Sequence, residues 1–573
     1  MRAEALQTAW FRGFFGALSR AGVTDVVASP GSRSTPLVAA AVHEPGLDIH
    51  TLYDERSAAF FALGQARVTG RPSVLVRTSG SAGAHDLPAV LEASYAHLPL
   101  IVVTADRPPE LQGAGAPQTM DQRHLFQPHV RADFELGMAD RAGLGGAVRK
   151  AVQAVHASLH VPGPVHVNAP CRKPLEPAEP RDEAEAELAG EVQARLQRPF
   201  RCVGARSTFD PSDLVEVAAR IDAAEHPWLV AGPHIGGPPP VAEVERFTRQ
   251  TGAVLAAETA SGLRHGGPPG HDGFAWPLRH RQPDLVVLLG AWPASRSLQQ
   301  VVETARVRVG LHPHGVMDPT GLEGWALVGD PADALRQLAD RCRPATADRR
   351  QAFETLRARD QALWRTARDP GFTEAGAVRT ILEHLPPEAT LFLGNSLAIR
   401  SVDRFVPATD RSLRVLHQRG LNGIDGLVSG AAGAASRAKG PTLALLGDVS
   451  FLHDLSGLEA AALAVAVSGR PLVLAVIHNG GGRIFDELPL ARTASPGLMA
   501  HFVTPHRKSF RGLSEVFSVD VCPVGDRDGL EEALARAFAA PRVTVLQIDV
   551  PADGAAQAGR AFEAAAAEVR GGR

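Results

Sequence analysis

The sequence has little cysteine, little net charge and no long apolar segment, and each shortage excludes a class of protein. Its 573 residues include only four cysteines, which form no CxxC pair: Cys171, Cys202, Cys342 and Cys522. This spacing excludes a disulfide-rich secreted scaffold and predicts a reducing compartment, the cytoplasm. With a formal net charge of -3 at pH 7, the chain lacks the excess of basic residues that binds nucleic acid or anionic membranes.

No apolar run is long enough to predict stable insertion into a membrane. The longest, LPLIVVTA and PLVLAVI, have the length of a β-strand. The opening segment MRAEALQTAWFRGFFGALSRAG has apolar residues at helical spacing, interrupted by charges. We therefore expect an amphipathic first helix there rather than a signal peptide.

Short β-branched runs alternate with helical segments from residue 24 onward, which is typical of βαβ units with a parallel sheet. A chain of this length is too long for a single hydrophobic core, and its length predicts about three domains. A Pro/Glu/Ala-rich stretch at 173–191 has the composition of a linker. We predict an α/β fold with three successive domains and mainly parallel sheets, at residues 1–180, 200–345 and 372–573.

The strongest chemical motif lies in the third domain, between LLGDVSFLHDLSGL and HNGGG. One apolar strand ends at Asp448, and the next ends at Asn479. Because parallel strands bring their carboxyl ends to one edge of the sheet, we expect the two side chains to converge. Carboxylate and amide oxygens suit Mg²⁺ completed by phosphate oxygens. The alternatives are a helix-capping Asp and a turn Asn.

The stretch SPGSRSTPL, at 29–37, lies where a strand meets a helix. Its prolines and glycine fit a turn in which Ser34 or Thr35 caps the helix. Backbone N–H groups, the Ser32 hydroxyl and the Arg33 guanidinium also fit an anion site. The residues by themselves leave both interpretations open.

The motif from GDVSFLHDLSGL to HNGGG resembles the diphosphate-and-metal motif of thiamine diphosphate enzymes. The resemblance implies a thiamine diphosphate-binding fold with a pyrimidine-binding, a central and a diphosphate-binding domain in the ranges above. It implies thiamine diphosphate as cofactor and Mg²⁺ as metal, with Mn²⁺ as the alternative. The residues it assigns to the cofactor are Glu55, Ile424, Gly447, Asp448, Val449, Ser450 and Asn479. The metal ligands it implies are Asp448, Asn479 and Gly481.

Glu55, in TLYDERSAAFFALG, matches the glutamate that this enzyme class places after a strand at the head of a helix. The resemblance implies that its carboxylate hydrogen-bonds the pyrimidine N1′ and favours the imino tautomer of the cofactor. An apolar cleft raises the pKa of such a carboxyl, which helps it to share that proton. The alternative is a glutamate favoured only by the positive helix N-terminus.

Seven motifs together resemble the 2-succinyl-5-enolpyruvyl-6-hydroxy-3-cyclohexene-1-carboxylate synthase family of menaquinone biosynthesis: SPGSRSTPL, DERSAAFFALG, TSGSAGAHDLPAVLEA, TADRPPEL, GNSLAIRSVD, QRGLNGIDG and HNGGGRIF. The resemblance implies a transferase that decarboxylates 2-oxoglutarate and adds the succinyl carbanion equivalent to isochorismate in a 1,4 fashion. It also implies a homo-oligomer, dimeric or tetrameric, with active sites shared between subunits.

Both of these substrates are dicarboxylates, and arginine is the side chain suited to binding carboxylates bidentately. Besides Glu55, the resemblance implies catalytic roles for Ser32, Arg33, Arg107, Gln118, Arg400 and Arg419. It implies substrate contacts for Arg296, Ser396, Ile484 and Phe485. The chain departs from the family pattern at Pro117, His478 and Ser295, where the family has Asn, Asn and Lys. These departures bear on substrate affinity more than on reaction type.

Three other functions stay open on the sequence. The first is another thiamine diphosphate-dependent 2-oxoacid decarboxylase or an acetolactate synthase-like enzyme, since WLVAGPHIGGPPP resembles a nucleotide-binding turn but lacks GxGxxG. The second is a dinucleotide-dependent oxidoreductase, suggested by the glycines of GLNGIDGLVSGAAG. Close packing of an Ala-rich helix explains those glycines equally well. The third is a binding protein without activity.

Overall fold

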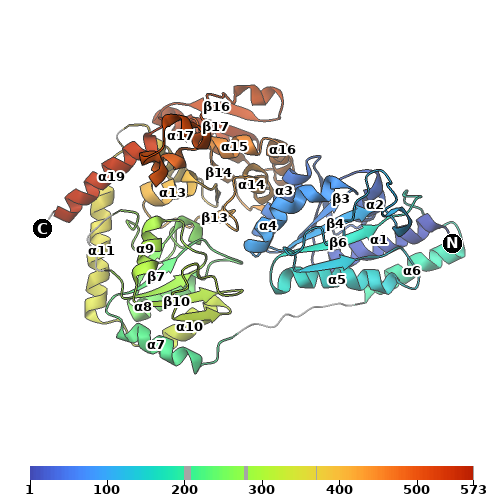
Figure 1. Cartoon of the computed structure of the whole chain (residues 1–573), viewed down its shortest axis with the longest axis horizontal. Coiled ribbons are helices and arrows are strands. Elements are labelled where there is room, and N and C mark those ends of the chain that lie inside the picture. Colours follow the sequence, from blue (N-terminus) through green and yellow to red (C-terminus); the bar gives the residue numbers. More distant parts are fainter. Residues whose placement is uncertain (199–207, 277–281, 370, 572–573) are drawn as a thin grey trace. The chain divides into compact units, whose positions relative to one another are not determined.

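The computed structural model describes residues 1–198, 208–276, 282–369 and 371–571 (Figure 1). Its described strands form three sheets, of six, five and six strands, and every neighbouring pair is parallel. The predicted α/β class with mainly parallel sheets is confirmed. The chain divides into two compact units, the first of Met1–Gly204, Gln418–Ala438 and His453–Arg470 and the second of the remaining segments.

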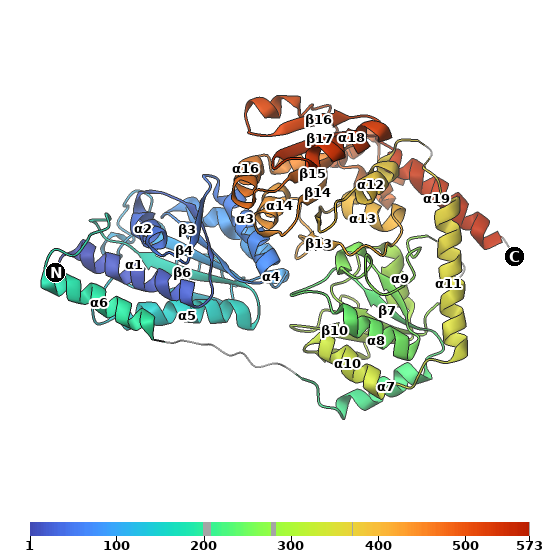
Figure 2. The same ribbon diagram turned by 180° about the vertical axis from the view of Figure 1, so that it is seen from behind.

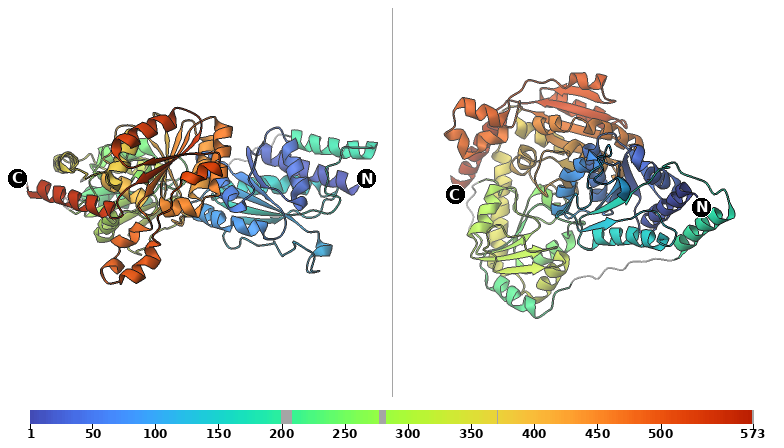
Figure 3. Two further views of the ribbon diagram at one scale, coloured as in Figure 1. Left: turned by 90° about the horizontal axis from the view of Figure 1, so that it is seen from above. Right: turned by 45° about the vertical axis from the view of Figure 1, so that its right-hand side comes forward.

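The first unit contains a sheet of order β2-β1-β3-β4-β6-β5. Its strands are β1 (Asp25–Ser29), β2 (Asp48–Thr51), β3 (Ser73–Arg77), β4 (Leu100–Asp106), β5 (Ala132–Glu135) and β6 (Pro164–Pro170). One apolar core joins this sheet to α1 (Ala3–Arg20), α2 (Thr35–His43), α5 (Leu144–His160) and α6 (Glu183–Gln197). The expected first helix is therefore confirmed, and Figure 3 shows α1 and α6 side by side in blue and teal. The linker prediction for 173–191 is wrong in its second half, because that part begins α6 and buries Leu188 in the same core.

Helix α3 (Glu55–Thr69) lies against β1 and β3, beside α4 (Leu87–Tyr95). It also packs on α14 (Leu427–Arg437) and α16 (Gly457–Ser468) within the same unit. The approach is close, because a Cβ on Gly64 would collide with the carbonyl oxygen of Gly430, and one on Gly433 with that of Phe61. These contacts confirm that helix packing explains the glycines of GLVSGAAG.

The second unit contains two sheets. The five-stranded sheet has the order β11-β10-β9-β7-β8 and consists of β7 (Pro227–Ala231), β8 (Val254–Ala257), β9 (Leu285–Leu289), β10 (Val307–His312) and β11 (Trp325–Val328). The helices of this region are α7 (Asp213–Ala223), α8 (Val241–Thr251), α9 (Arg296–Thr304) and α10 (Pro331–Arg341). Alternate residues of the strands enter two separate cores, so both faces of this sheet are covered.

The six-stranded sheet of the second unit has the order β13-β12-β14-β15-β17-β16. Its strands are β12 (Thr390–Leu393), β13 (Arg414–His417), β14 (Thr442–Gly447), β15 (Leu472–His478), β16 (Asp520–Val524) and β17 (Val543–Asp549). The remaining helices are α11 (Ala347–Thr366), α12 (Glu374–Glu383), α13 (Leu397–Phe405), α15 (Asp448–His453), α17 (Pro496–Val503), α18 (Arg527–Phe538) and α19 (Gly554–Gly571). Helices α11 and α19 pack side by side (Figure 2). Because β14 and β15 are adjacent and parallel, the residues that follow them meet at one edge.

Two findings concern the predicted absence of a membrane segment and the cysteines. Among the described helices, none combines the length and the apolar character that crossing a membrane requires. Cys171, Cys342 and Cys522 are free thiols, and Cys202 lies outside the described residues.

Candidate active site

The turn after β1 carries the first group of predicted residues. Ser32 lies in a short 3₁₀ turn, Ser32–Ser34, which leads directly into α2. The Ser34 hydroxyl donates to the carbonyl of Gly31 at 2.9 Å and accepts from its N–H at 3.1 Å. Ser34 occupies the N-cap position of α2, as expected, but its side chain makes no capping hydrogen bond to this helix. The Ser34 side chain instead closes the turn that presents Ser32 and Arg33.

Arg33 is buried, with 6% of its surface exposed. Its Nη1 donates to the carbonyl of Cys171 at 2.8 Å, and its buried Nε makes no hydrogen bond among the described residues. Burial lowers the pKa of Arg33, and the nearby charge of Arg107 lowers it further. A buried guanidinium nitrogen without an acceptor is the kind of donor that a carboxylate satisfies.

Two buried hydroxyls follow β3, the strand next to β1. The oxygens of Thr78 and Ser79 are buried, and within the described ranges they find no hydrogen-bond partner. A Cβ on Gly31 would lie 2.7 Å from the Thr78 side chain, so the segments that follow β1 and β3 are in contact. Gln118, with a φ of 58°, donates from Nε2 to the carbonyl of Ser79 at 3.3 Å. Sequence reasoning missed both hydroxyls, although TSGSAG after a strand was the available signal.

The half-buried Arg107 donates from Nη2 to the carbonyl of Pro117 at 2.9 Å. Pro117 therefore takes part in the site through its backbone, although it replaces the Asn of the family pattern. Arg33, Gln118 and Arg107 thus lie at the carboxyl edge of the first sheet. The loop from Pro117 to Gln118 connects them.

Glu55 is the first residue of α3, as predicted. Asp54 caps this helix by accepting from the N–H of Ser57 at 3.0 Å. The fully buried Arg77 donates from Nη2 to the carbonyl of Glu55 at 3.3 Å and from Nε to the carboxylate of Asp86 at 2.9 Å. Desolvation raises the pKa of Asp86 to about 6, against the opposing effect of Arg77. This ion pair holds the start of α3 in place, and sequence reasoning missed it.

Arg419 and Ile424 belong to the same unit, in the segment before α14. The Glu92 carboxylate accepts from the N–H groups of Gly420 and Leu421, at 2.9 and 2.8 Å, and so fixes this segment to α4. Ile424 is half-buried. The structure thereby brings Arg419 and Ile424 into the unit that carries Glu55.

In the second unit, the predicted convergence of Asp448 and Asn479 is confirmed. Asp448 is the first residue of α15 and is 1% exposed. Its Oδ2 accepts from the N–H groups of Gly480 and Gly481, at 2.8 and 3.1 Å. The Oδ1 of Asn479 is buried, and no described group hydrogen-bonds to it.

The glycine loop after β15 has a shape that only glycine allows. Gly480 and Gly481 have φ values of 78° and 141°, and a Cβ on Gly481 would meet the carbonyl oxygen of Val503. A carboxylate, an unpaired amide oxygen and backbone carbonyls form a hard-oxygen donor set. The residues present therefore fit a divalent cation of the kind that accompanies a diphosphate.

Comparisons with known proteins agree with this geometry. Residues 11–125 match the family described as "Thiamine pyrophosphate enzyme, N-terminal TPP binding domain". The chain is 40% identical to the 2-succinyl-5-enolpyruvyl-6-hydroxy-3-cyclohexene-1-carboxylate synthase of Sorangium cellulosum (strain So ce56), over 98% of this chain and 95% of that protein. It is 33% identical to the synthase of the same name from Roseiflexus sp. (strain RS-1), over 97% of each.

The chain belongs to the 2-succinyl-5-enolpyruvyl-6-hydroxy-3-cyclohexene-1-carboxylate synthase family. Among solved structures, it resembles benzoylformate decarboxylase from Polynucleobacter necessarius with a TM-score of 0.71, at 18% identity, over 96% of this chain and 99% of that one. That likeness concerns the fold alone. The chain is thus a thiamine diphosphate enzyme by family, and its fold agrees.

Two further predicted residues of this synthase-family member lie together at the start of α13. Ser396, with a φ of 65°, precedes the helix, and Arg400 donates from Nη1 to its carbonyl at 2.7 Å. Ile484 and Phe485 lie half-buried in a 3₁₀ turn after the glycine loop, where the ring of Phe485 is 5.6 Å from that of Phe502. Gly447, Val449 and Ser450 flank Asp448 at the junction of β14 and α15.

Arg296 differs from the other predicted arginines of this family member. It begins α9, its side chain is 66% exposed, and its Nη1 lies 3.2 Å from Glu303 and 3.1 Å from Gln299 on the same helix. The structure brings no other predicted site residue into contact with it among the residues described. Its role as a substrate ligand stays a prediction.

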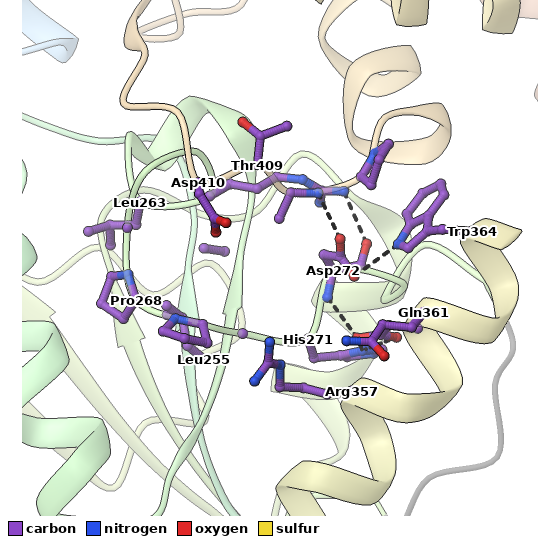
Figure 4. Close-up of a pocket in the computed structure, with 18 of the residues that line it drawn as sticks. Leu255, Leu263, Pro268, His271, Asp272, Arg357, Gln361, Trp364, Thr409 and Asp410 are labelled. Atoms are coloured by element: carbon purple, nitrogen blue, oxygen red, sulfur yellow. Dashed lines mark hydrogen bonds and ion pairs between the residues drawn. The ribbon is translucent and has the colours of Figure 1, made fainter. Parts of the chain in front are cut away.

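A cavity of about 410 Å³ in the second unit lies apart from the predicted residues of the synthase family (Figure 4). Several of the polar groups that line it are paired with one another. Asp272 accepts from the indole N–H of Trp364 at 2.9 Å and from the N–H of Ala408 at 2.7 Å, and His271 pairs with Asp360 at 2.9 Å. These bonds connect α11 to the loops that line the cavity.

Proposed function

We propose that this protein is a thiamine diphosphate- and divalent metal-dependent transferase that decarboxylates 2-oxoglutarate and adds the succinyl unit to isochorismate in a 1,4 fashion. The product is 2-succinyl-5-enolpyruvyl-6-hydroxy-3-cyclohexene-1-carboxylate. The observation that carries the proposal is the buried Asp448, bonded to the loop that presents the unpaired oxygen of Asn479. The names of the relatives point to the same reaction.

The metal and diphosphate belong at the carboxyl edge of β14 and β15. Asp448, Asn479 and the carbonyl of Gly481 would hold Mg²⁺, with Mn²⁺ as the alternative, and Gly447, Val449 and Ser450 would face the diphosphate. Thiamine diphosphate, when bound, supplies the nucleophilic carbon and the electron sink that decarboxylation requires. The protein contributes binding, orientation and proton transfer.

Glu55 would hold a proton at the pyrimidine N1′ of the cofactor. Its place at the first turn of α3 is fixed on two sides, by Asp54 at the cap and by Arg77 at its own carbonyl. These bonds hold the backbone from which the Glu55 carboxylate extends, so its position is fixed through the proton transfers that the reaction needs. Ile424 would serve as the apolar wedge under the cofactor.

The arginines would bind the carboxylates of the two substrates. Arg33 has the strongest structural support, since its buried Nε lacks an acceptor among the described residues. The buried Ser79 hydroxyl, which follows the neighbouring strand β3, is also unpaired there. Ser32, Arg107 and Gln118 lie on the same sheet edge, and Arg419 belongs to the same unit. Ser396, Arg400, Ile484 and Phe485 would shape the pocket from the second unit, with Arg296 as a further candidate.

Assembly and location follow from the same proposal. Glu55 and Asp448 belong to different compact units, and both are needed for one cofactor. We propose a homo-oligomer, a dimer or tetramer, in which active sites are shared between subunits, and a cytoplasmic location. An active monomer in analytical ultracentrifugation would contradict the shared site.

The test is a reconstitution with purified protein, thiamine diphosphate, Mg²⁺, 2-oxoglutarate and isochorismate. We expect isochorismate to disappear only when all components are present and the succinylated product to form. Decarboxylation of 2-oxoglutarate without loss of isochorismate would favour another thiamine diphosphate-dependent decarboxylase. A flavin spectrum in the purified protein would favour an acetolactate synthase-like enzyme.

A further inference from the structure

Two histidines lie beside the carboxylate of Asp448 in the second unit. His478 ends β15, and His506 lies in the loop that follows α17. One ligand atom from each of Asp448, His478 and His506 lies within 4.8 Å of the others. Both histidine side chains are largely buried, at 14% and 10% exposed.

The hydrogen bond of His478 to Asp549 fixes its imidazole ring and leaves Nε2 available to bind a metal. Its Nδ1 lies 2.7 Å from Oδ1 of Asp549, the residue that pairs with it in the neighbouring strand β17. Gln547 donates to the same carboxylate oxygen at 3.0 Å. With Nδ1–H bound to a carboxylate, the lone pair is left on Nε2, and this atom is buried without a hydrogen bond in the part of the chain described. A carboxylate–histidine pair of this kind is the usual support for a metal-bound imidazole.

His506 is held by its backbone and by its other ring nitrogen. Its N–H donates to the carbonyl of Gly480 at 3.2 Å, and its Nδ1 accepts from the N–H of Lys508 at 3.4 Å. Its Nε2 lies 3.4 Å from Oδ2 of Asp448 and makes no hydrogen bond among the described residues. The ring is 5.5 Å from that of His478, centroid to centroid. Two buried imidazole nitrogens therefore flank one carboxylate.

We propose that Asp448, His478 and His506 form a two-histidine, one-carboxylate site that binds a first-row transition ion such as Mn²⁺, Co²⁺ or Zn²⁺ without thiamine diphosphate. Oxygen ligands suit Mg²⁺, whereas imidazole nitrogens favour the transition ions. The proposal deepens the proposed function, since it concerns the metal of that same site. It states that, in the absence of thiamine diphosphate, Asp448 shares an ion with the two imidazole nitrogens.

The test uses the metal alone. Full-length protein is stripped with a chelator and titrated with Co²⁺ in the absence of thiamine diphosphate, and the visible ligand-field bands and bound metal are measured. We expect one equivalent of Co²⁺ with bands characteristic of nitrogen ligation. His478→Asn and His506→Gln should abolish these bands, and Asp549→Asn should weaken binding by about 10- to 100-fold. His501→Asn, an exposed change on α17, is the matched control and should bind like the parent.

Unchanged Co²⁺ affinity and bands in His478→Asn and His506→Gln would overturn the proposal, as would a parent protein that binds no Co²⁺ until thiamine diphosphate is added. Circular dichroism and thermal melting identify any variant that fails to fold, and Asp549→Asn then serves as the milder change.

The isochorismate assay with Mg²⁺ separates the two proposals. If isochorismate is turned over but Co²⁺ shows no nitrogen ligation, only the proposed metal site is wrong. If Co²⁺ shows nitrogen ligation but isochorismate is not turned over, only the proposed reaction is wrong.

Discussion

The buried ion pair between Arg77 and Asp86 leads to the sharpest prediction about stability. Arg77 has no exposed surface, and its Nε donates to both oxygens of Asp86, at 2.9 and 3.0 Å. Its Nη1 donates to the carbonyl of Val27 at 3.2 Å and to the hydroxyl of Ser29 at 3.3 Å. With the further bond to Glu55, one side chain connects β1, β3 and α3.

Replacing Arg77 with Met removes these bonds and leaves the Asp86 carboxyl buried without a partner. Breaking a buried ion pair from one side costs about 3–5 kcal/mol of stability. The double variant Arg77→Met with Asp86→Leu removes both charges, and replacement of such pairs by apolar groups is often neutral. We therefore expect the single change to lower the free energy of unfolding by about 3–5 kcal/mol and the double change to recover most of that loss.

Urea denaturation followed by circular dichroism measures both variants. The exposed Arg71→Met is the control, and it should change the free energy of unfolding by no more than about 0.5 kcal/mol. The turnover number is measured on the double variant, where stability is no longer limiting. Turnover should stay low there, because the carbonyl of Glu55 has lost its donor. A loss below about 1 kcal/mol in Arg77→Met, or full turnover in the double variant, would refute this reasoning.

Three further predictions concern single residues. Glu55→Gln should leave metal and diphosphate binding intact by calorimetry while strongly reducing isochorismate turnover, and unchanged turnover would remove Glu55 from the mechanism. Arg33→Ala should raise the KM for isochorismate by roughly 10- to 100-fold, since a charge-assisted hydrogen bond contributes about 1.5–3 kcal/mol; an effect on melting temperature alone would make Arg33 structural. Burial raises the pKa of Asp454 from 3.8 to about 6, although Ser429 donates to it at 2.7 Å. The folded state then binds this proton more tightly than the unfolded state, so stability should fall by up to roughly 3 kcal/mol as pH rises from about 4 to about 6. Asp454→Asn should show a smaller fall in urea midpoints over this range, with the contribution of Asp86 remaining, and an equal pH dependence in both proteins would contradict the cause.

Much of the candidate site was predictable because it follows local rules. Glu55 comes directly after a strand and a capping Asp, and Asp448 and Asn479 come directly after two adjacent apolar strands. Parallel strands end at one edge, so the convergence of Asp448 with the glycine loop required only the strand assignment. The three α/β sheets were likewise readable from alternating strand and helix patterns. Ser34 makes no capping hydrogen bond to α2 because its hydroxyl found a nearer partner in Gly31.

The fold class, the family and the residues that end each strand can be predicted from the amino-acid sequence alone, because they depend on neighbours along the chain. Which distant groups form hydrogen bonds with one another depends on how the chain packs. Arg33 bonds a carbonyl 138 positions away, Arg77 connects two strands to the start of α3, and His506 reaches Asp448 from a loop beyond α17. A buried polar group must find its partner wherever the packed chain supplies one, and no local pattern encodes that choice.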